Sequence, residues 1–245
     1  MLILYKLCGL NDFMIFREKF KTLNDVFDIF TEKNIFKLIS QGHFAALESP
    51  ISIGKEANIF TAKKGKDRVI VKIYRLNTCD FNKMYEYLKF DPRYSDTRRS
   101  RRQVIFTWVQ REYRNLLKSR EAGVRVPTPI AVFSNILVLE FIGSDEPAPK
   151  LKDLIPENLE KFFDEVILNM KKLFKAGIVH GDLSAFNILN FNDKPVFIDM
   201  SQSTTTENPR FQEYLLRDVK NVCNHFRKIG LKFDDDDVYG RIVGK

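Results

Sequence analysis

Apolar residues recur at helical spacing in four parts of the chain. Between residues 11 and 48 they alternate with charged residues and predict two or three short helices. A further helix is predicted from residue 104 to a stop at Gly123, because glycine readily takes the left-handed conformation that ends a helix. Residues 158 to 176 carry the most regular apolar face, and a further amphipathic helix is predicted from 211 to 226.

Runs of β-branched and aromatic residues predict strands in the first part of the chain. The sequences NIFTAKK and DRVIVKIY flank a Lys-Gly-Lys turn, which is typical of a β-hairpin. The sequence NILVLEFIG is typical of a buried strand. Strands therefore dominate before residue 142 and helices after it, which indicates an α+β protein.

Two segments follow neither pattern. Residues 78 to 103 collect charge, and the stretch DPRYSDTRRSRRQ holds five arginines in thirteen residues, so we expect a flexible loop there. The segment SDEPAPKLKD combines prolines with acidic residues and predicts an exposed, stiff connector.

Composition and charge narrow the class of protein. The chain has 245 residues, of which 44% are hydrophobic, and this is enough for a substantial core. The formal net charge of +8 favours a polyanionic partner. Cys8, Cys79 and Cys223 are far apart and lack metal-ligand spacing, which is typical of reduced thiols in a cytosolic protein. No apolar run approaches the about 20 residues of a membrane span, and the start of the chain does not resemble a secretion signal, so we expect a cytoplasmic protein without a membrane partner.

Five polar side chains occur in the order that phosphoryl transfer from ATP requires. Lys72 lies in a predicted strand and Glu112 in a predicted helix, where they can pair beside the nucleotide phosphates. The stretch GDLSAFNILNFNDKPVFIDM places Asp182 and Asn187 in one tight loop and Asp199 after the next strand. One aspartate can accept the proton of an attacking hydroxyl, and the other two residues offer the oxygen ligands that Mg²⁺ prefers.

Taken singly, each of these residues has an ordinary structural explanation. A strand lysine or a helix glutamate is usually solvated, and Asp-x-x-x-x-Asn often occurs by chance. His180 is expected to be structural, with its ring hydrogen bonded to the backbone of the loop. The ordered set nevertheless indicates a nucleotide phosphotransferase. The usual G-x-G-x-x-G loop of kinases is missing, and ISIGKEANIF, with Gly54, stands in its place.

Several motifs together resemble the RIO family of atypical serine/threonine protein kinases. In chain order they are ISIGKEANIF, VKIYR, DPRY, TWVQREYRNL, LVLEFIG, PAPKLKD, VHGDLSAFNIL and IDMSQS, and they cover most of the chain. The S-x-G-K-E-A loop and the I-D-x-S-Q segment are specific to the family, and the Pro-Ala-Pro connector resembles its type-1 branch. Two positions depart from the pattern: Ile53 stands where threonine is usual, and Gly181 where alanine is usual.

The resemblance implies a two-lobed protein-kinase-like fold without the usual activation segment and substrate-binding subdomains. It implies a helical N-terminal extension over residues 1–48 and a β-rich N-terminal lobe over 49–142, which includes the flexible loop at 78–103. A helical C-terminal lobe over 143–245 would follow.

Residue roles are implied by the same resemblance. Asp182 corresponds to the catalytic aspartate, and Asn187 and Asp199 correspond to the ligands of Mg²⁺, or of Mn²⁺ in its place. Lys72 corresponds to the lysine that binds the ATP phosphates, with Glu112 as its helix partner. The implied catalytic set is therefore Lys72, Asp182 and Asp199.

The resemblance also implies the remaining contacts with ATP. Backbone groups of Glu140 and Ile142 would meet the adenine. The phosphate loop would consist of Ser52, Gly54, Lys55 and Glu56.

The activity implied is that of an ATP-dependent serine kinase that phosphorylates itself. Ser100, flanked by arginines, is the favoured autophosphorylation site, with Ser95 and Thr97 as alternatives. An associated ATPase cycle would place a phosphoryl group on Asp199. The family is linked to maturation of the small ribosomal subunit, so the pre-ribosomal subunit and its RNA are expected partners beside ATP.

Two other functions remain open. Small-molecule phosphotransferases that modify antibiotics or choline have similar sites, although they usually lack a serine-containing basic loop and have an acidic substrate pocket. A nucleotide-switched RNA-binding assembly factor with little kinase activity would instead use a cluster of arginines to neutralise phosphates. Those residues are Arg93, Arg98, Arg99, Arg101 and Arg102, for which a solvated loop is the structural alternative.

Overall fold

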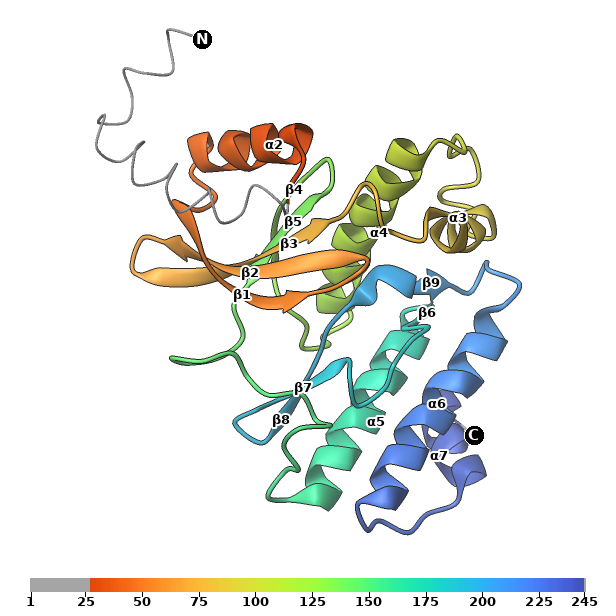
Figure 1. The fold of residues 1–245 in the computed structure, drawn as a ribbon. Helices are drawn as coiled ribbons and strands as arrows, with labels where there is room; N and C mark the ends of the chain where they lie inside the picture. Colours follow the sequence, from red (N-terminus) through yellow and green to blue (C-terminus); the bar gives the residue numbers. More distant parts are fainter. Residues whose placement is uncertain (1–26, 245) are drawn as a thin grey trace, which may run out of the picture.

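The computed structural model describes residues 27–244, which form a sheet-containing N-terminal lobe and a mainly helical C-terminal lobe (Figure 1). The elements of the N-terminal lobe are α2 (Ile29–Ser40), β1 (Ala46–Ile53), β2 (Ala57–Lys64), β3 (Asp67–Tyr74), α3 (Phe81–Lys89), α4 (Arg101–Glu121), β4 (Pro129–Phe133) and β5 (Ile136–Glu140). Those of the C-terminal lobe are α5 (Leu159–Lys175), β6 (Ile178–Val179), β7 (Ile188–Phe191), β8 (Lys194–Phe197), the short 3-10 helix η2 (Met200–Gln202), β9 (Thr204–Thr205), α6 (Phe211–Lys228) and α7 (Asp235–Val243). The predicted two-lobed α+β fold class is confirmed.

The five-stranded antiparallel sheet has the order β1-β2-β3-β5-β4. β2 and β3 form the predicted hairpin, and Gly65, at φ +63°, supplies the left-handed residue of its turn. Lys72 of β3 pairs with Ile59 of β2 on one side and with Leu137 of β5 on the other. The backbone of this lysine is therefore fixed from both sides.

The two faces of the sheet belong to different cores. Because side chains alternate along a strand, Ile136 and Val138 of β5 pack with α2, whereas Leu137 and Leu139 join the core that contains α4. The sheet thus lies between α2 and α4 (Figure 1).

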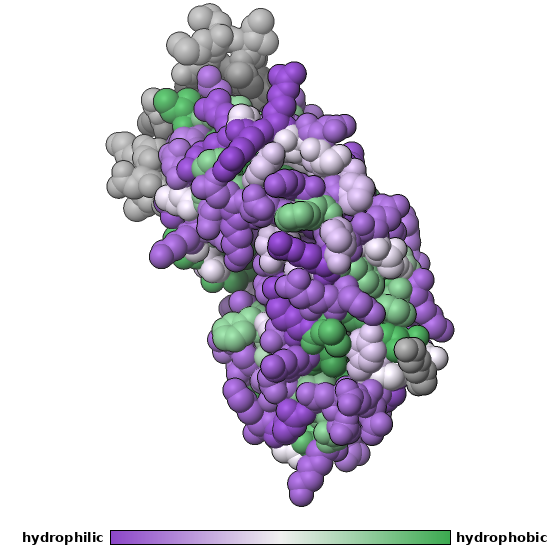
Figure 2. Space-filling view, turned by 90° about the vertical axis from the view of Figure 1, so that its right-hand side faces the viewer, coloured by the Kyte–Doolittle hydropathy of each residue, from purple (hydrophilic) through white to green (hydrophobic). Residues whose placement is uncertain are grey.

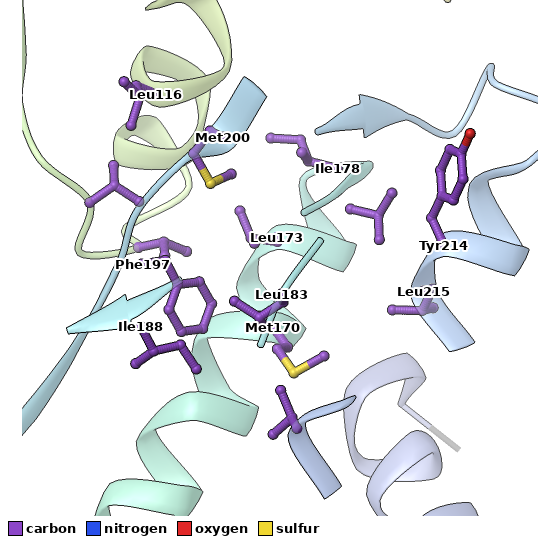
Figure 3. Packing of buried hydrophobic residues seen from close by; sticks show 14 of the residues in the cluster. Leu116, Met170, Leu173, Ile178, Leu183, Ile188, Phe197, Met200, Tyr214 and Leu215 are labelled. Atoms are coloured by element: carbon purple, nitrogen blue, oxygen red, sulfur yellow. The ribbon is translucent and has the colours of Figure 1, made fainter. Parts of the chain in front are cut away.

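The core of the C-terminal lobe is built on α5 and α6. The buried face of α5 confirms the helix predicted over residues 158 to 176, and α6 confirms the helix predicted after it. Figure 3 shows Met170 and Leu173 of α5 beside Leu183 and Ile178. Leu116 of α4 belongs to the same cluster, so one continuous core joins the two lobes.

A regular helix lies where the sequence pattern predicted a loop. Within residues 78 to 103, α3 spans Phe81–Lys89, and its buried residues are Met84 and Leu88. The Asp80 side chain accepts a hydrogen bond from the Lys83 N–H group and caps the helix. The prediction of a loop is therefore wrong for this part of the segment. The apolar spacing is helical but short, and the charged residues around it obscured it.

Other expectations for the chain have mixed outcomes. α2 is one of the helices predicted between residues 11 and 48, and the part of that prediction before residue 27 lies outside the described residues. Cys79 and Cys223 are both free and buried, whereas Cys8 lies outside the described residues. Among residues 27–244, no helix combines the length and the apolar character that crossing a bilayer requires.

Candidate active site

The centre of the site is a buried lysine held between two carboxylates. Lys72 Nζ lies 2.7 Å from Glu112 Oε1 and 3.1 Å from Asp199 Oδ1. Burial disfavours the charge on Lys72, but Asp199 and Glu112 outweigh burial and raise its pKa well above the usual value. Lys72 is therefore a stable cation. Burial raises the pKa of Glu112, and the direct contact with the Lys72 ammonium group opposes that rise.

Tyr74 completes the environment of Glu112. Its hydroxyl donates to Glu112 Oε2 at 2.5 Å, while Lys72 occupies Oε1. Both carboxylate oxygens are thus used, and the side chain of Glu112, which is 1% exposed, is fixed in one orientation. The sheet supplies Lys72 and Tyr74, and α4 supplies Glu112, so the pairing sets the distance between sheet and helix.

Asp199 follows β8 and has a left-handed backbone, with φ 60° and ψ 64°. Its Oδ1 accepts from Ser201 Oγ at 2.6 Å as well as contacting Lys72. Burial raises the pKa of this carboxyl, but Lys72 and the Ser201 hydroxyl outweigh burial and lower it to about 2. Asp199 is therefore an anion at neutral pH, and its Oδ2 makes no hydrogen bond within residues 27–244.

Asp182 and Asn187 lie in one loop between β6 and β7. Asn187 Nδ2 donates to the main-chain oxygen of Asp182 at 2.9 Å and to its Oδ2 at 3.4 Å. Gln202 Nε2 donates to the same Oδ2 at 3.2 Å. Burial and the nearby Asp199 raise the pKa of Asp182, and the cations Arg217 and Lys83 oppose that rise.

Asp218 of α6 fixes the backbone of the loop that carries Asp182. Its two carboxylate oxygens accept from the N–H groups of Gly181 and Leu183, at 2.7 and 2.8 Å. Arg217 also donates to the main-chain oxygen of Gly181. Burial raises the pKa of Asp218 to about 7, so this carboxylate is sensitive to pH close to neutrality.

His180 has the structural position that the sequence predicted. Its Nε2 lies 3.0 Å from the main-chain oxygen of Ile198, and its Nδ1 accepts from the Asp182 N–H group at 3.3 Å. Nε2 therefore carries the proton, because the carbonyl oxygen can only accept. Burial lowers the pKa of His180 to about 4, so the ring is neutral and links the Asp182 loop to the end of β8.

The glycine-poor loop between β1 and β2 is anchored by the segment that follows β3. The Gly54 N–H group donates to Ala57 O at 3.1 Å and closes the turn. Arg75 donates to the Gly54 carbonyl, and Thr78 Oγ1 donates to the carbonyl of Lys55 at 2.7 Å. Ser52 and Glu56 are exposed, and the predicted loop residues lie together where β1 turns into β2.

The end of β5 presents backbone groups at the junction between the lobes. The Glu140 N–H group donates to Thr128 O, and its carboxylate binds Arg125 and Thr128. The carbonyl of Ile142 accepts from Ala148, whereas its N–H group makes no hydrogen bond within the described residues. The main-chain N–H group of Ile142 is therefore available to donate a hydrogen bond to a ligand, whereas the carboxylate of Glu140 is already bound to Arg125 and Thr128.

The arginines of the predicted loop have different environments. Arg93 is not free for a partner, because it pairs with buried Asp91 at 2.7 Å and donates to Asn115. Arg99 and Arg102 are exposed and lie over the rings of Tyr85 and Phe30, respectively. Arg101 donates to main-chain oxygens, whereas Arg98 is exposed. The interpretation of the cluster as a solvated loop therefore fits only part of it. Figure 2 shows that the surface on the side of α3 and α6 is largely hydrophilic.

The available oxygens fit a hard divalent cation. Asn187 uses its amide nitrogen on Asp182, so its Oδ1 is left over, and Asp199 keeps Oδ2. One carboxylate and one amide oxygen, completed by phosphate oxygens and water, match the ligand preference of Mg²⁺. Among the described residues, no cluster of three or more His, Cys, Asp or Glu side chains could hold a metal ion.

Several residues that shape the site were not among those predicted from the sequence. Tyr74, Gln202 and Asp218 contact Glu112, Asp182 and the loop backbone through hydrogen bonds that span 20 to 38 residues. The sequence IDMSQS contains Gln202, and its specificity to a family was the one available signal. Nothing in the apolar pattern of α6 marks Asp218.

The structure joins a five-stranded sheet that carries part of a lysine–glutamate pair to a helical lobe whose loops carry an Asp–Asn pair and a further aspartate. This combination defines the protein-kinase-like class of phosphotransferases. The family model described as "RIO domain" matches residues 58–238. The chain is 43% identical to the RIO-type serine/threonine-protein kinase Rio1 of Haloferax volcanii over 229 residues, covering 93% of this chain and 79% of that protein. It is also 43% identical to the protein of the same name from Methanocaldococcus jannaschii, over 94% of this chain and 80% of that one. This chain belongs to the RIO family of serine/threonine-protein kinases.

A solved structure supports the same fold. The Rio2 kinase of Chaetomium thermophilum, in an ADP/Mg²⁺-phosphoaspartate complex, aligns with a TM-score of 0.65 and 20% identity. The alignment covers 86% of this chain and 66% of the Rio2 chain. At this identity the likeness concerns the fold alone.

Proposed function

We propose that this chain is a type-1 RIO serine kinase that transfers the γ-phosphoryl group of ATP, with Mg²⁺ or Mn²⁺, to a serine hydroxyl. The observation that carries the proposal is the position of Lys72 Nζ, 2.7 Å from Glu112 and 3.1 Å from Asp199. This contact joins the lysine–glutamate pair of the sheet lobe to a proposed metal ligand of the other lobe. A nucleotide bound between the lobes would meet all three groups.

Each side chain then has one proposed role. Lys72 neutralises the phosphates, and Glu112 holds it extended. Asn187 and Asp199 bind the metal through the oxygens that their internal hydrogen bonds leave over. Asp182 accepts the proton of the attacking hydroxyl through its Oδ1, because the internal hydrogen bonds of this carboxylate use Oδ2. Burial raises the pKa of Asp182.

Backbone groups complete the proposed ATP site. The Ile142 N–H group and the main chain of Glu140 would recognise adenine. The connection between β1 and β2 would cover the phosphates through Ser52, Gly54, Lys55 and Glu56. Its anchoring by the segment after β3 supports this role, because a loop held by side chains presents its N–H groups in a fixed direction.

Incubation with radiolabelled ATP and Mg²⁺, without added substrate, tests the proposal. We expect the chain to label itself. Asp182→Ala should abolish labelling with ATP still bound, Asp199→Ala should lose Mg²⁺-dependent binding and turnover together, and Lys72→Ala should weaken ATP use. Asp67→Ala, which changes an exposed aspartate at the start of β3, is the control and should behave as the wild type. Full activity in Lys72→Ala would refute the assignment.

The same experiment separates the small-molecule alternative. A phosphotransferase of the antibiotic or choline type would not label itself and would wait for its substrate. The curated relatives are named protein kinases, which favours self-labelling.

Ser100 is the proposed autophosphorylation site. It is the exposed N-cap residue of α4, and its side chain makes no capping hydrogen bond. A phosphate there would face the helix N-terminus and the neighbouring Arg101 and Arg102, which is a favourable setting for a negative charge. Mass spectrometry of the ATP-treated chain distinguishes Ser100 from Ser95 and Thr97. A second labelled position at Asp199, which is labile in alkali, would support an ATPase cycle with a phosphoaspartate.

The proposed cellular role is maturation of the small ribosomal subunit in the cytoplasm, with pre-ribosomal RNA as a partner. Exposed Arg98, Arg99 and Arg102 support RNA binding, whereas Arg93 is excluded by its pairing with Asp91. RNA affinity measured against salt should lose about 2 units of slope when these three arginines are replaced, at about 0.7 per phosphate contact for single strands. Equal slopes would exclude the cluster and leave the kinase assignment untouched.

A further inference from the structure

The carboxylate of Asp182 is held through one of its two oxygens. Oδ2 accepts from Gln202 Nε2 at 3.2 Å and from Asn187 Nδ2 at 3.4 Å. Asn187 uses the same nitrogen in a shorter bond, of 2.9 Å, to the main-chain oxygen of Asp182. The side-chain nitrogen of Gln202, unlike that of Asn187, therefore hydrogen bonds only to the Asp182 carboxylate. Oδ1 makes no hydrogen bond within residues 27–244 and is left for another group.

Gln202 is placed by a turn that is bound tightly to α4. The turn is the 3-10 helix η2, and Asn115 Nδ2 donates to the carbonyl oxygens of both Met200 and Ser203, at 2.9 and 2.8 Å. Arg111 Nη2 reaches the carbonyl of Gln202 itself at 3.4 Å. The backbone on either side of Gln202 is thus fixed, which restricts where its amide can reach.

The turn is also bound to the loop that it serves. Ser203 Oγ donates to the main-chain oxygen of His180 at 3.0 Å. A Cβ atom on Gly181 would lie only 2.8 Å from the Gln202 carbonyl, so the two backbones pass in close contact. Gln202 therefore approaches Asp182 from a rigid support and not from a mobile surface loop.

We propose that Gln202 is a positioning residue for phosphoryl transfer: its amide holds Oδ2 of Asp182 so that Oδ1 meets the substrate hydroxyl. The inference rests on the role proposed above for Asp182. In that step the hydroxyl oxygen bonds to the γ-phosphorus, its proton passes to Oδ1, and ADP leaves with the electron pair of the broken P–O bond. Gln202 touches neither ATP nor the hydroxyl and acts through Asp182.

The chemistry of the amide makes the proposal selective. A carboxylate oxygen only accepts, so the group that faces it must donate, and Nε2 does so. Gln202→Met keeps the length of the side chain and removes the donor. Gln202→Glu keeps the shape and turns an oxygen toward Asp182, which adds repulsion between two carboxylates. The second variant should therefore lose more activity than the first.

The test measures autophosphorylation at saturating ATP together with the ATP concentration that gives the half-maximal rate. For Gln202→Met we expect the maximal rate to fall about tenfold, as for the loss of a hydrogen bond to a charged group. The half-saturating ATP concentration and the thermal midpoint should stay as in the wild type. Gln212→Met, an exposed glutamine in the first turn of α6, is the matched control and should change neither quantity.

A second comparison keeps this inference separate from the proposed function. In the Asp182→Asn background, whose residual rate is followed in long incubations at high enzyme concentration, Gln202→Met should cause no further loss, because a residue that acts through Asp182 has nothing left to position. A further loss there would overturn the inference, as would an unchanged rate in Gln202→Met while Asp182→Asn is impaired. Full activity of Asp182→Asn would instead overturn the proposed role of Asp182, and the inference with it.

Discussion

Replacing Glu112 tests the buried pair at the centre of the site. Glu112→Leu removes one of the two carboxylates that contact Lys72, and it also removes the acceptor of the Tyr74 hydroxyl. Breaking a buried pair typically costs about 3–5 kcal/mol. Because Asp199 still contacts Lys72 at 3.1 Å, we expect the lower end, about 3 kcal/mol. Glu112→Gln keeps an oxygen that accepts from Lys72 and places its NH₂ group beside the Tyr74 oxygen, which can accept a hydrogen bond. The variant loses the charge but leaves neither neighbour without a partner, so about 1 kcal/mol is expected.

The assay is thermal unfolding combined with ATP-dependent autophosphorylation. For a chain of this size, 1 kcal/mol shifts the midpoint by about 2–4 °C, so Glu112→Leu should unfold about 6–12 °C below the wild type. Glu112→Gln should lie only about 2–4 °C below it. Both variants should lose at least about tenfold in kcat/KM for ATP, because without the negative charge at position 112 the Lys72 ammonium group is drawn toward Asp199 and away from the phosphates.

The control is Glu121→Leu, an exposed glutamate at the end of the same helix, which should change stability and activity little. Equal midpoints for Glu112→Leu and Glu112→Gln would refute the reasoning about the lost acceptor. Wild-type kcat/KM in Glu112→Gln would refute the link between the pair and the phosphates.

Three further changes test the loop around Asp182. The pKa of buried His180 is about 4 in the folded protein, below its usual 6.5. The neutral ring therefore stabilises the fold above pH 6.5, and this contribution is lost as the pH falls to 4. Across this window the unfolding free energy of the wild type should fall by up to about 3 kcal/mol relative to that of His180→Gln. Gly181→Ala should lower the thermal midpoint by about 2–8 °C, because a left-handed alanine is strained by about 1–2 kcal/mol and its Cβ meets the Gln202 carbonyl at 2.8 Å. Asp218→Asn leaves the N–H group of Gly181 or Leu183 without an acceptor, so autophosphorylation should fall at unchanged ATP binding, and an unaltered rate would contradict the supporting role of Asp218.

The sequence pattern could predict the elements that carry the site because each has a strong local period. The hairpin around Gly65 and the amphipathic face of α5 are recorded in residues close together in the chain. The pairing of Lys72 with Glu112 could be inferred because a strand lysine and a helix glutamate have a known joint purpose. For α3 the same method failed, since two buried residues in nine do not stand out among charged neighbours.

The supporting hydrogen bonds could not be predicted, because they join residues without any shared pattern. Asp218 looks like an ordinary polar position of α6, and only the fold brings it under Gly181 and Leu183. Arg93 looked like part of a solvated cluster, whereas its neighbour Asp91 is fully buried and binds it. A buried charge needs a partner, but the sequence does not say which charges will be buried.

Both ends of the site are held by one stretch of α4. Glu112 fixes Lys72 on the side of the sheet, while Arg111 and Asn115 hold the turn that carries Gln202. These residues occupy adjacent turns of a single helix, so a shift of α4 would move the Lys72 contact and the Gln202 support together. The lysine that meets the nucleotide and the aspartate proposed to meet the hydroxyl are therefore not independently adjustable. A change that displaces α4 should impair ATP use and phosphoryl transfer in parallel, whereas Gln202→Met, which leaves the helix in place, should separate the two.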